Sequence, residues 1–169
     1  MKRAILFILY FALIIQASAQ DRAQHEIHAA MVYNFIKYIQ WPNEGEPGDF
    51  VLGVVGDDKI FATLKQWYEG KAKGSKKFVV RKLEAASEAG ECQAVYIGSS
   101  KNKSFDDVKT AVAGKSVLTI TDGNGMAAKG SCINFRVIDG KLKFELNQSA
   151  VVGANLKVSG QLSSMAILI

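Results

Sequence analysis

The sequence predicts an α/β fold: one domain with a largely parallel mixed sheet, helices on its flanks and a C-terminal β-hairpin. Apolar runs typical of strands buried on both faces alternate with segments of helical periodicity, which is the pattern of parallel strands joined by helices. An Asp139-Gly140 pair then joins two segments in which apolar and polar residues alternate, as in a hairpin. Once its predicted leader is removed, the chain of 169 residues has the length of one ordinary domain.

Residues 1–19 have the features of a secretory signal peptide. Lys2 and Arg3 precede an uncharged apolar run over residues 4–15, and Ala17-Ser18-Ala19 forms a small-x-small cleavage site. A membrane-spanning helix needs roughly 20 apolar residues, and this run is shorter. We therefore expect cleavage after Ala19, export of the chain, and a folded domain over residues 20–169.

Residues 25–42 predict the first helix, which we expect to cover the sheet. Its apolar stripe has helical spacing and consists of Ile27, Met31, Phe35 and Tyr38. Trp41-Pro42 is expected to end the helix, because a residue that precedes proline avoids the α region.

Several residues of this first helix are expected to be structural rather than contact residues. Asn34 is polar in an otherwise apolar segment, and a buried amide is tolerated only when it is hydrogen-bonded. We therefore expect the Asn34 amide to be buried and bonded. Phe35 belongs to the apolar stripe, and Trp41, followed by Pro42, brings a large apolar surface to the helix exit.

After a polar loop, the chain alternates between predicted strands and helices. Strands are expected over residues 50–55, 77–83, 94–97 and 116–121. One helix is expected to follow Asp57 or Asp58 as its cap and to run to about Tyr68, and another is expected over residues 104–113. This layout is Rossmann-like, but it lacks a dinucleotide site because no GxGxxG loop is present.

Residues 133–147 predict a hairpin whose register can be checked within the sequence. With Asp139-Gly140 as the turn, the facing pairs are Val137 with Leu142, Phe135 with Phe144, and Ile133 with Leu146. All three apolar pairs fall on one face, which supports this register. The other face is expected to be polar and bears Asn134, Arg136, Lys143 and Glu145. After Ser149 we expect two short helices, the last running from about Ser159 to the C-terminus.

The residues that could carry chemistry do not form a catalytic set. The only histidines, His25 and His28, fall on the first turn of the first helix, where we expect surface histidines rather than metal ligands. A small lysine cluster, Lys71, Lys73, Lys76 and Lys77, lies in a Gly/Ser loop and lacks the interleaved aromatics of a nucleic-acid face. The net charge falls from +5 to +3 when Lys2 and Arg3 are removed. We expect no enzyme activity, no cofactor or metal, and no nucleic-acid partner.

Cys92 and Cys132 are expected to be free and buried, although two cysteines in an exported chain suggest a disulfide. Cys92 precedes the third predicted strand, and Cys132 begins the hairpin. If the hairpin's first strand is antiparallel to its neighbour, the two residues lie at opposite ends of the sheet. If it is parallel, two or three strand spacings of about 4.8 Å separate them. Both arrangements exceed the roughly 7 Å limit for a disulfide.

A set of short motif segments occurs in order along nearly the whole exported chain: Ala29-Ala30 through Tyr33-Asn34-Phe35, Trp41-Pro42, Val54 to Asp57, Val95 to Gly98, Val117 to Asp122, Ile133 to Phe135, Phe144 to Asn147, and Leu156 to Ser159. In this ordered set the chain resembles the YfiR-like family of exported bacterial proteins. The motif residues Asn34, Phe35, Trp41, Pro42 and Asn147 are expected to be structural. The resemblance implies a periplasmic α/β domain without enzymatic activity.

The resemblance also implies a partner. The best-known member of the family represses a membrane-anchored diguanylate cyclase by binding its periplasmic part, and disulfides tune that repression. The present chain has only two cysteines, which is fewer than the redox-responsive members carry, so redox control is not implied here. Membership does not fix which sensor is bound, and a histidine kinase is equally compatible. Attachment to the membrane is expected only through the partner, and a homodimer stays open.

Two classes of function follow: a regulatory module for a membrane signalling protein, or a small-ligand-binding protein with its pocket at the carboxyl edge of the parallel strands. For the first class, the candidate contact residues are Tyr33, Lys37 and Gln40. Tyr33 lies roughly 200° around the helix from Phe35 and so points outward. The alternative is that another helix, such as the C-terminal one, covers Tyr33.

Overall fold

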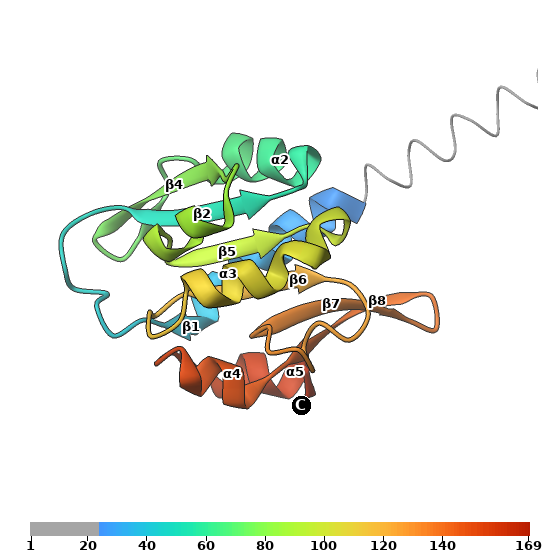
Figure 1. Cartoon of the computed structure of the whole chain (residues 1–169). Coiled ribbons are helices and arrows are strands. Elements are labelled where there is room, and N and C mark those ends of the chain that lie inside the picture. Colours follow the sequence, from blue (N-terminus) through green and yellow to red (C-terminus); the bar gives the residue numbers. More distant parts are fainter. Residues whose placement is uncertain (1–23) are drawn as a thin grey trace, which may run out of the picture.

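An eight-stranded mixed sheet forms the centre of the computed structural model, which describes residues 24–169 (Figure 1). In chain order its strands are β2 (Phe50–Val55), β3 (Ala72–Lys73), β4 (Lys76–Lys82), β5 (Ala94–Ile97), β6 (Leu118–Asp122), β7 (Ile133–Ile138), β8 (Lys141–Leu146) and β10 (Ile167–Leu168). Across the sheet the order is β10-β8-β7-β6-β5-β2-β4-β3. The predicted signal peptide and its cleavage site lie outside the described residues.

The five central strands are parallel, and the edges make the sheet mixed. β4, β2, β5, β6 and β7 run in the same direction, whereas β3 and β8 are antiparallel to β4 and β7. β10 is parallel to β8 and forms one edge. The predicted fold class, a largely parallel mixed sheet with a C-terminal hairpin, is confirmed.

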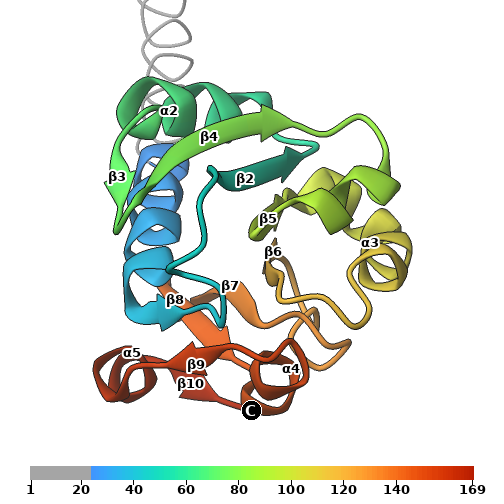
Figure 2. The same ribbon diagram turned by 90° about the vertical axis from the view of Figure 1, so that its left-hand side faces the viewer.

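Helices cover both faces of this sheet (Figure 2). The N-terminal helix (residues 24–38) and α2 (Asp58–Tyr68) pack on one face, and α3 (Phe105–Ala111) packs on the other with the 3-10 turns η1 (Ala86–Glu91) and η2 (Ser99–Ser104). Asp57 is the cap of α2, since its side chain accepts a hydrogen bond from the Ile60 backbone at 2.9 Å. Each face therefore has its own apolar core.

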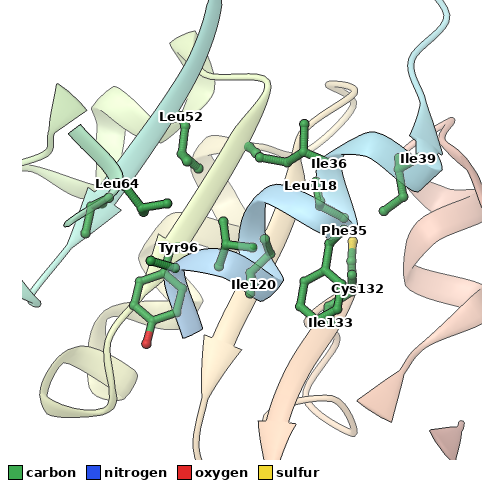
Figure 3. Close-up of a cluster of buried hydrophobic side chains, with 14 of the residues drawn as sticks. Phe35, Ile36, Ile39, Leu52, Leu64, Tyr96, Leu118, Ile120, Cys132 and Ile133 are labelled. Atoms are coloured by element: carbon green, nitrogen blue, oxygen red, sulfur yellow. The ribbon is translucent and has the colours of Figure 1, made fainter. Parts of the chain in front are cut away.

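The N-terminal helix buries its apolar side against the strands. Phe35, Ile36 and Ile39 project toward Leu118, Ile133 and their neighbours (Figure 3). The predicted end of this helix at Trp41-Pro42 is wrong: it ends at Tyr38. The next two residues form β1 (Ile39–Gln40), which pairs antiparallel with β9 (Lys157–Val158). The backbone of β1 therefore bonds to another strand instead of continuing the helix.

The hairpin of β7 and β8 has the predicted register. Val137 pairs with Leu142, Phe135 with Phe144, and Ile133 with Leu146. Asp139 and Gly140 both have positive φ angles, 51° and 70°, as a two-residue turn that matches the strand twist requires.

The tail beyond the hairpin contains more than the two predicted helices. α4 (Gln148–Gly153) and α5 (Gly160–Met165) are present, but α5 ends at Met165 and the chain then adds β10 to the sheet. The Ile169 backbone N–H donates to the Leu146 carbonyl at 3.0 Å. The prediction of a helix to the C-terminus is therefore wrong for the last residues. Among the described residues, no helix combines the length and apolar character needed to span a bilayer.

Candidate functional site

Tyr33 lies in a group of aromatic rings where the N-terminal helix meets α2. Its ring stacks on that of Tyr68 with centroids 4.1 Å apart and planes 7° apart, and it also contacts Phe78 at 5.5 Å. Trp67 packs edge-on against Tyr68 at 6.1 Å. Tyr33, Trp67 and Tyr68 are all half-buried. The helix that partly covers Tyr33 is therefore α2 and not the C-terminal α5.

Lysines lie over these rings. Lys37 Nζ is 5.7 Å from the centre of the Tyr33 ring, and Lys71 Nζ is 4.9 Å from that of Tyr68, both within cation–π range. Within residues 24–169 no carboxylate forms an ion pair with either lysine. We call Tyr33, Lys37, Trp67, Tyr68 and Lys71 the aromatic–lysine face.

The electrostatic environment of this face is positive and partly desolvated. Burial and the neighbouring Tyr33 raise the pKa of Tyr68 above its ordinary value. Tyr68 is therefore a neutral phenol at any physiological pH and can donate a hydrogen bond to an incoming group. Gln40, the third predicted contact residue, is exposed but lies in β1 opposite Lys157, outside the helix that carries Tyr33 and Lys37.

Asn34 does not have the environment that the sequence predicted. It is exposed, and it lines a hollow of about 260 Å³ between the N-terminal helix, β8 and α5. The prediction of a buried, hydrogen-bonded amide is therefore wrong. Of its two neighbours, Phe35 is buried and Tyr33 is half-buried, whereas Asn34 itself lies at the hollow.

The other motif residues lie at packing positions. Trp41 is buried, meets Phe50 edge-on at 4.9 Å, and donates from Nε1 to the Gln93 carbonyl at 3.0 Å. Phe35 is buried against Phe135 and Phe144, and Pro42 is exposed.

Asn147, the last of these motif residues, joins two segments that are distant in the sequence. Its side chain accepts from the Ala150 backbone as the cap of α4, and its amide nitrogen donates to the Ala127 carbonyl, both at 2.8 Å. Asn147 therefore fixes the start of α4 to the loop that follows β6.

The carboxyl ends of β2 and β5, where an open α/β sheet usually binds a ligand, are closed by the chain itself. The Ser100 hydroxyl donates to the Gly56 carbonyl at 2.7 Å. A Cβ atom added at Gly98 would lie 2.9 Å from Cβ of Asp57 and 3.1 Å from the Gly56 oxygen, so these loops are in close contact. A hollow of about 410 Å³ lies beside this point, lined by charges of both signs that include Asp58, Lys82 and Lys101.

A cluster of titratable groups, which we call the helix-side cluster, lies at the same edge beneath the N-terminal helix: His28, Asp57, Tyr96 and Asp122. His28 is 2% exposed, so the prediction of a surface histidine is wrong for this residue. Its ring stacks on Phe135 with centroids 4.2 Å apart, and its Nδ1 lies 3.8 Å from Oδ2 of Asp122. That distance is too long for a hydrogen bond.

The helix-side cluster leaves buried polar atoms without partners. His28 Nε2 and the Tyr96 hydroxyl are buried and have no hydrogen-bond partner among residues 24–169. Burial lowers the pKa of His28 against the attraction of Asp122, and burial raises the pKa of Asp122 against the attraction of His28. Burial and the nearby carboxylates also raise the pKa of Tyr96, so its phenol stays neutral.

A second polar cluster, the hairpin network, lies on the opposite face of the sheet at the same edge: Thr121, Ser131, Asn134, Arg136 and Glu145. The Thr121 hydroxyl hydrogen-bonds to Ser131 Oγ and to Asn134 Oδ1, both at 2.9 Å. Asn134 Nδ2 donates to the Gly123 carbonyl at 2.8 Å and to Glu145 at 2.7 Å, and Arg136 pairs with Glu145 at 2.8 Å.

This network corrects the predicted polar face of the hairpin. Asn134 and Glu145 are 0% and 7% exposed, and the loop after β6 contacts Asn134 through the Gly123 carbonyl. Of these four residues only Lys143 is fully exposed, and Arg136 is half-buried. The predicted outward-facing polar surface is therefore wrong at the base of the hairpin. The sequence contained a signal for this burial. In the predicted register Glu145 lies next to both Asn134 and Arg136, so one carboxylate can bond to the amide and to the guanidinium.

The two cysteines are buried in different cores. Cys92 packs in the core on the α3 side, and Cys132 packs in the core under the N-terminal helix. They are not joined by a disulfide. Burial raises the pKa of the Cys92 thiol to about 11, and it also raises that of Cys132, so both thiols are poor nucleophiles at neutral pH. Within the described chain, no three His, Cys, Asp or Glu side chains converge as metal ligands.

Comparison with known proteins identifies the family. Residues 25–167 match the model of the YfiR/HmsC-like family, so the chain belongs to this family. Among solved structures, the chain is similar to a conserved domain protein of Vibrio cholerae O1 biovar El Tor strain N16961, with a TM-score of 0.56 and 11% identity. The match covers 85% of the present chain and 59% of that one, so it demonstrates a shared fold only. No curated protein matches the chain.

The family gives the coarse class of protein. The YfiR-like family consists of periplasmic regulatory proteins. The present chain is therefore assigned to a family of periplasmic regulatory proteins.

Proposed function

We propose that this protein binds the extracytoplasmic part of a membrane-anchored signalling protein and represses it. The observation that carries the proposal is the family match over residues 25–167. By family resemblance the partner is a diguanylate cyclase, and a sensor histidine kinase is the alternative. The protein reaches the membrane through this partner.

The aromatic–lysine face is the surface proposed for the contact, with Gln40 assigned to its rim. Aromatic side chains are enriched among the residues that dominate binding energy. The rings of Tyr33, Trp67 and Tyr68 already contact one another, so little side-chain entropy is lost when a partner covers them. Lys37 and Lys71 have no carboxylate partner among the described residues, and they favour an acidic segment on the signalling protein.

The test is capture of membrane proteins by the exported chain, with identification by mass spectrometry. The parent is expected to capture a protein that has an extracytoplasmic segment and a cytoplasmic cyclase or kinase domain. Capture by Lys37→Glu and Lys71→Glu is expected to fall at least about tenfold, because attraction becomes repulsion. Lys141→Glu, at the exposed first residue of β8, is the matched control and is expected to bind like the parent.

The outcomes separate the surface from the function. Normal capture by both lysine variants would place the contact elsewhere on the molecule. Failure of the parent to capture any signalling protein would overturn the proposal itself. If the partner is a cyclase, its co-expression with the parent is expected to lower cellular cyclic di-GMP, and co-expression with Lys37→Glu is expected to restore it.

A second candidate function is binding of a small ligand. The hollow of about 410 Å³ at the carboxyl ends of β2 and β4 favours it, since Lys82 and Lys101 line that hollow. Native mass spectrometry of the purified chain would find a bound small molecule if this function is correct. Lys101→Ala would then release the molecule, and the capture of membrane proteins would not depend on Lys37.

A further inference from the structure

A groove that neither proposed function uses lies between α3 and α4, at the amino ends of β6 and β7. Its volume is about 370 Å³, and Figure 1 shows α4 below the last turn of α3. We call it the α3–α4 groove. Four of the residues that line it are almost completely buried, so the groove reaches the interior of the protein: Phe105, Val117, Thr119 and Cys132. The aromatic–lysine face contributes no residue to it.

The walls of the α3–α4 groove carry small apolar side chains. Ala113 follows the end of α3, and Ala150 and Ala154 lie on α4 and at its end. Because these side chains are short, they leave the space between the two helices open above Phe105 and Val117. Concave apolar surface of this kind favours the apolar part of a small ligand, which leaves water when it enters.

The uncharged polar side chains inside the groove are mostly bonded to the protein itself. The Thr119 hydroxyl accepts a hydrogen bond from the Cys132 backbone N–H at 3.0 Å. The amide of Asn147 caps α4 and holds the loop after β6, as described above. Only Ser149, which is exposed, adds a further hydroxyl. A sugar or a nucleobase needs several polar partners at once, so the groove does not suit either of them.

Two exposed lysines, Lys109 and Lys115, line the same groove. Lys109 Nζ donates to the Lys129 carbonyl at 3.2 Å, and Lys115 Nζ donates to the Gly90 carbonyl at 3.1 Å. Each ammonium group has three N–H donors, so both can also bond to a ligand. No carboxylate among residues 24–169 forms an ion pair with either lysine, and none of the described residues that line the groove is acidic. The groove therefore combines an apolar interior with uncompensated positive charge at its exposed margin.

Charge and size together select the class of ligand. A free amino acid is disfavoured, because its ammonium group would meet two lysines and no carboxylate. The volume lies near the lower end of the range of about 300–1,000 Å³ for ligand pockets, so one short chain fits better than a lipid with two chains.

We infer that the α3–α4 groove binds the free anion of a medium-chain fatty acid. The chain lies against Phe105 and Val117, and the carboxylate bonds to Lys109 and Lys115. Lysine side chains suit this position, since their apolar stems line the groove while their charged ends stay at its margin. The inference is independent of the proposed signalling function and leaves the aromatic–lysine face free for the partner.

The test is calorimetric titration of the exported chain with decanoate at neutral pH, below the concentration at which decanoate forms micelles. The parent is expected to bind one decanoate per chain. Lys109→Glu and Lys115→Glu are each expected to raise the dissociation constant at least about tenfold, because attraction becomes repulsion. Lys141→Glu, on β8, makes the same change of charge outside the groove and is expected to bind like the parent. Acetate lacks the chain and decyltrimethylammonium lacks the negative charge, so each is expected to bind at least about tenfold more weakly than decanoate.

A second pair of variants tests the apolar part of the groove. Ala113→Phe places a ring at an exposed position of the groove wall, and it is expected to weaken decanoate binding at least about tenfold. Ala72→Phe adds the same ring at an exposed position on β3, outside the groove, and is expected to bind like the parent. Unchanged melting temperatures establish that both variants are folded.

Three outcomes would overturn the inference. The first is a parent that binds no decanoate, and binding of phosphatidylglycerol vesicles in its place would assign the lysines to a lipid surface. The second is equal affinity for decanoate and decyltrimethylammonium, since the groove would then not select an anion. The third is parental affinity in Lys109→Glu, Lys115→Glu and Ala113→Phe, which would place the bound decanoate elsewhere on the molecule.

Discussion

Two polar clusters lie at the end of β6 on opposite faces of the sheet, and they differ in how completely their atoms are bonded. Thr121 belongs to the hairpin network, and the next residue, Asp122, belongs to the helix-side cluster, because successive strand residues point to opposite faces. Within the part of the chain that the structure describes, the hairpin network leaves only Arg136 Nε without a partner, whereas the helix-side cluster leaves both His28 Nε2 and the Tyr96 hydroxyl unpaired.

The difference follows from how each cluster is assembled. Asn134, Arg136 and Glu145 come from two paired strands, so a fixed register places them within hydrogen-bond distance of each other. The helix-side cluster instead depends on how the N-terminal helix docks on strand ends, and docking is governed by apolar packing such as the stack of His28 on Phe135. Polar groups that are placed by strand register therefore find hydrogen-bond partners. Titratable groups that are buried by the docking of a helix do not, and burying them without partners lowers the stability of the fold.

The largest expected effect on stability comes from a substitution in the hairpin network. Glu145→Ala removes the acceptor for both Asn134 and Arg136, and it is expected to lower the free energy of unfolding by about 3 kcal/mol. The size of the loss reflects a buried amide that keeps only one of its two acceptors and a half-buried guanidinium that loses its partner. Urea unfolding at neutral pH measures the change.

Lys143→Ala is the control for this prediction, because Lys143 lies on the same strand and face but is exposed. Its removal is expected to change stability by less than about 0.5 kcal/mol. If Glu145→Ala costs no more than Lys143→Ala, the hairpin network does not stabilise the fold and the comparison fails.

The sequence predicted the hairpin register but not the burial of its polar face. Alternation and the Asp139-Gly140 turn are local signals, and they were sufficient to align Ile133 with Leu146. The loop after β6 contacts Asn134 through the Gly123 carbonyl, and no local sequence pattern predicts where a loop will lie.

The same limit explains the errors in the first helix and the tail. His28 was predicted to be exposed and is buried, whereas Asn34 was predicted to be buried and is exposed. Both environments depend on which side of the N-terminal helix packs against the sheet and on how wide its apolar stripe is. The strands over Phe50–Val55 and Ala94–Ile97 were predicted to the residue, since continuous apolar runs between polar loops define them without tertiary information. β10 was missed because two residues carry no period, and its strand character arises only from pairing with β8.

A smaller effect on stability is expected when a change of pH alters the charge of the helix-side cluster. Burial lowers the folded-state pKa of His28 below its ordinary value of 6.5, so the unfolded chain binds this proton more readily. The contribution of His28 to stability is therefore complete above about pH 6.5 and is lost as the pH falls toward the folded-state pKa. One such group changes stability by at most about 1.4 kcal/mol per pH unit.

The measurement is the pH dependence of urea unfolding in the parent and in His28→Phe, which keeps the ring against Phe135. The parent is expected to lose stability on acidification from pH 6.5, and the variant is expected to have a shallower slope in that window. The raised pKa of Asp122 acts in the opposite sense at lower pH, since the folded state then binds its proton more readily than the unfolded chain. Equal slopes in the two proteins would mean that His28 does not titrate as a buried group.

The smallest expected effect is that of Tyr96→Phe, and it separates the two clusters most sharply. The Tyr96 hydroxyl is buried and unpaired, so its removal loses no hydrogen bond and relieves a desolvation cost. The expected change in the free energy of unfolding is between zero and a gain of about 1 kcal/mol. Thr121→Val is the matched substitution in the hairpin network: it also removes one buried hydroxyl, but that hydroxyl bonds to Ser131 and Asn134, so a loss of about 1–2 kcal/mol is expected. Opposite signs for these two variants would establish that the sheet carries a satisfied and an unsatisfied cluster on its two faces. A loss from Tyr96→Phe as large as that from Thr121→Val would instead mean that a bound water pairs with the Tyr96 hydroxyl in solution.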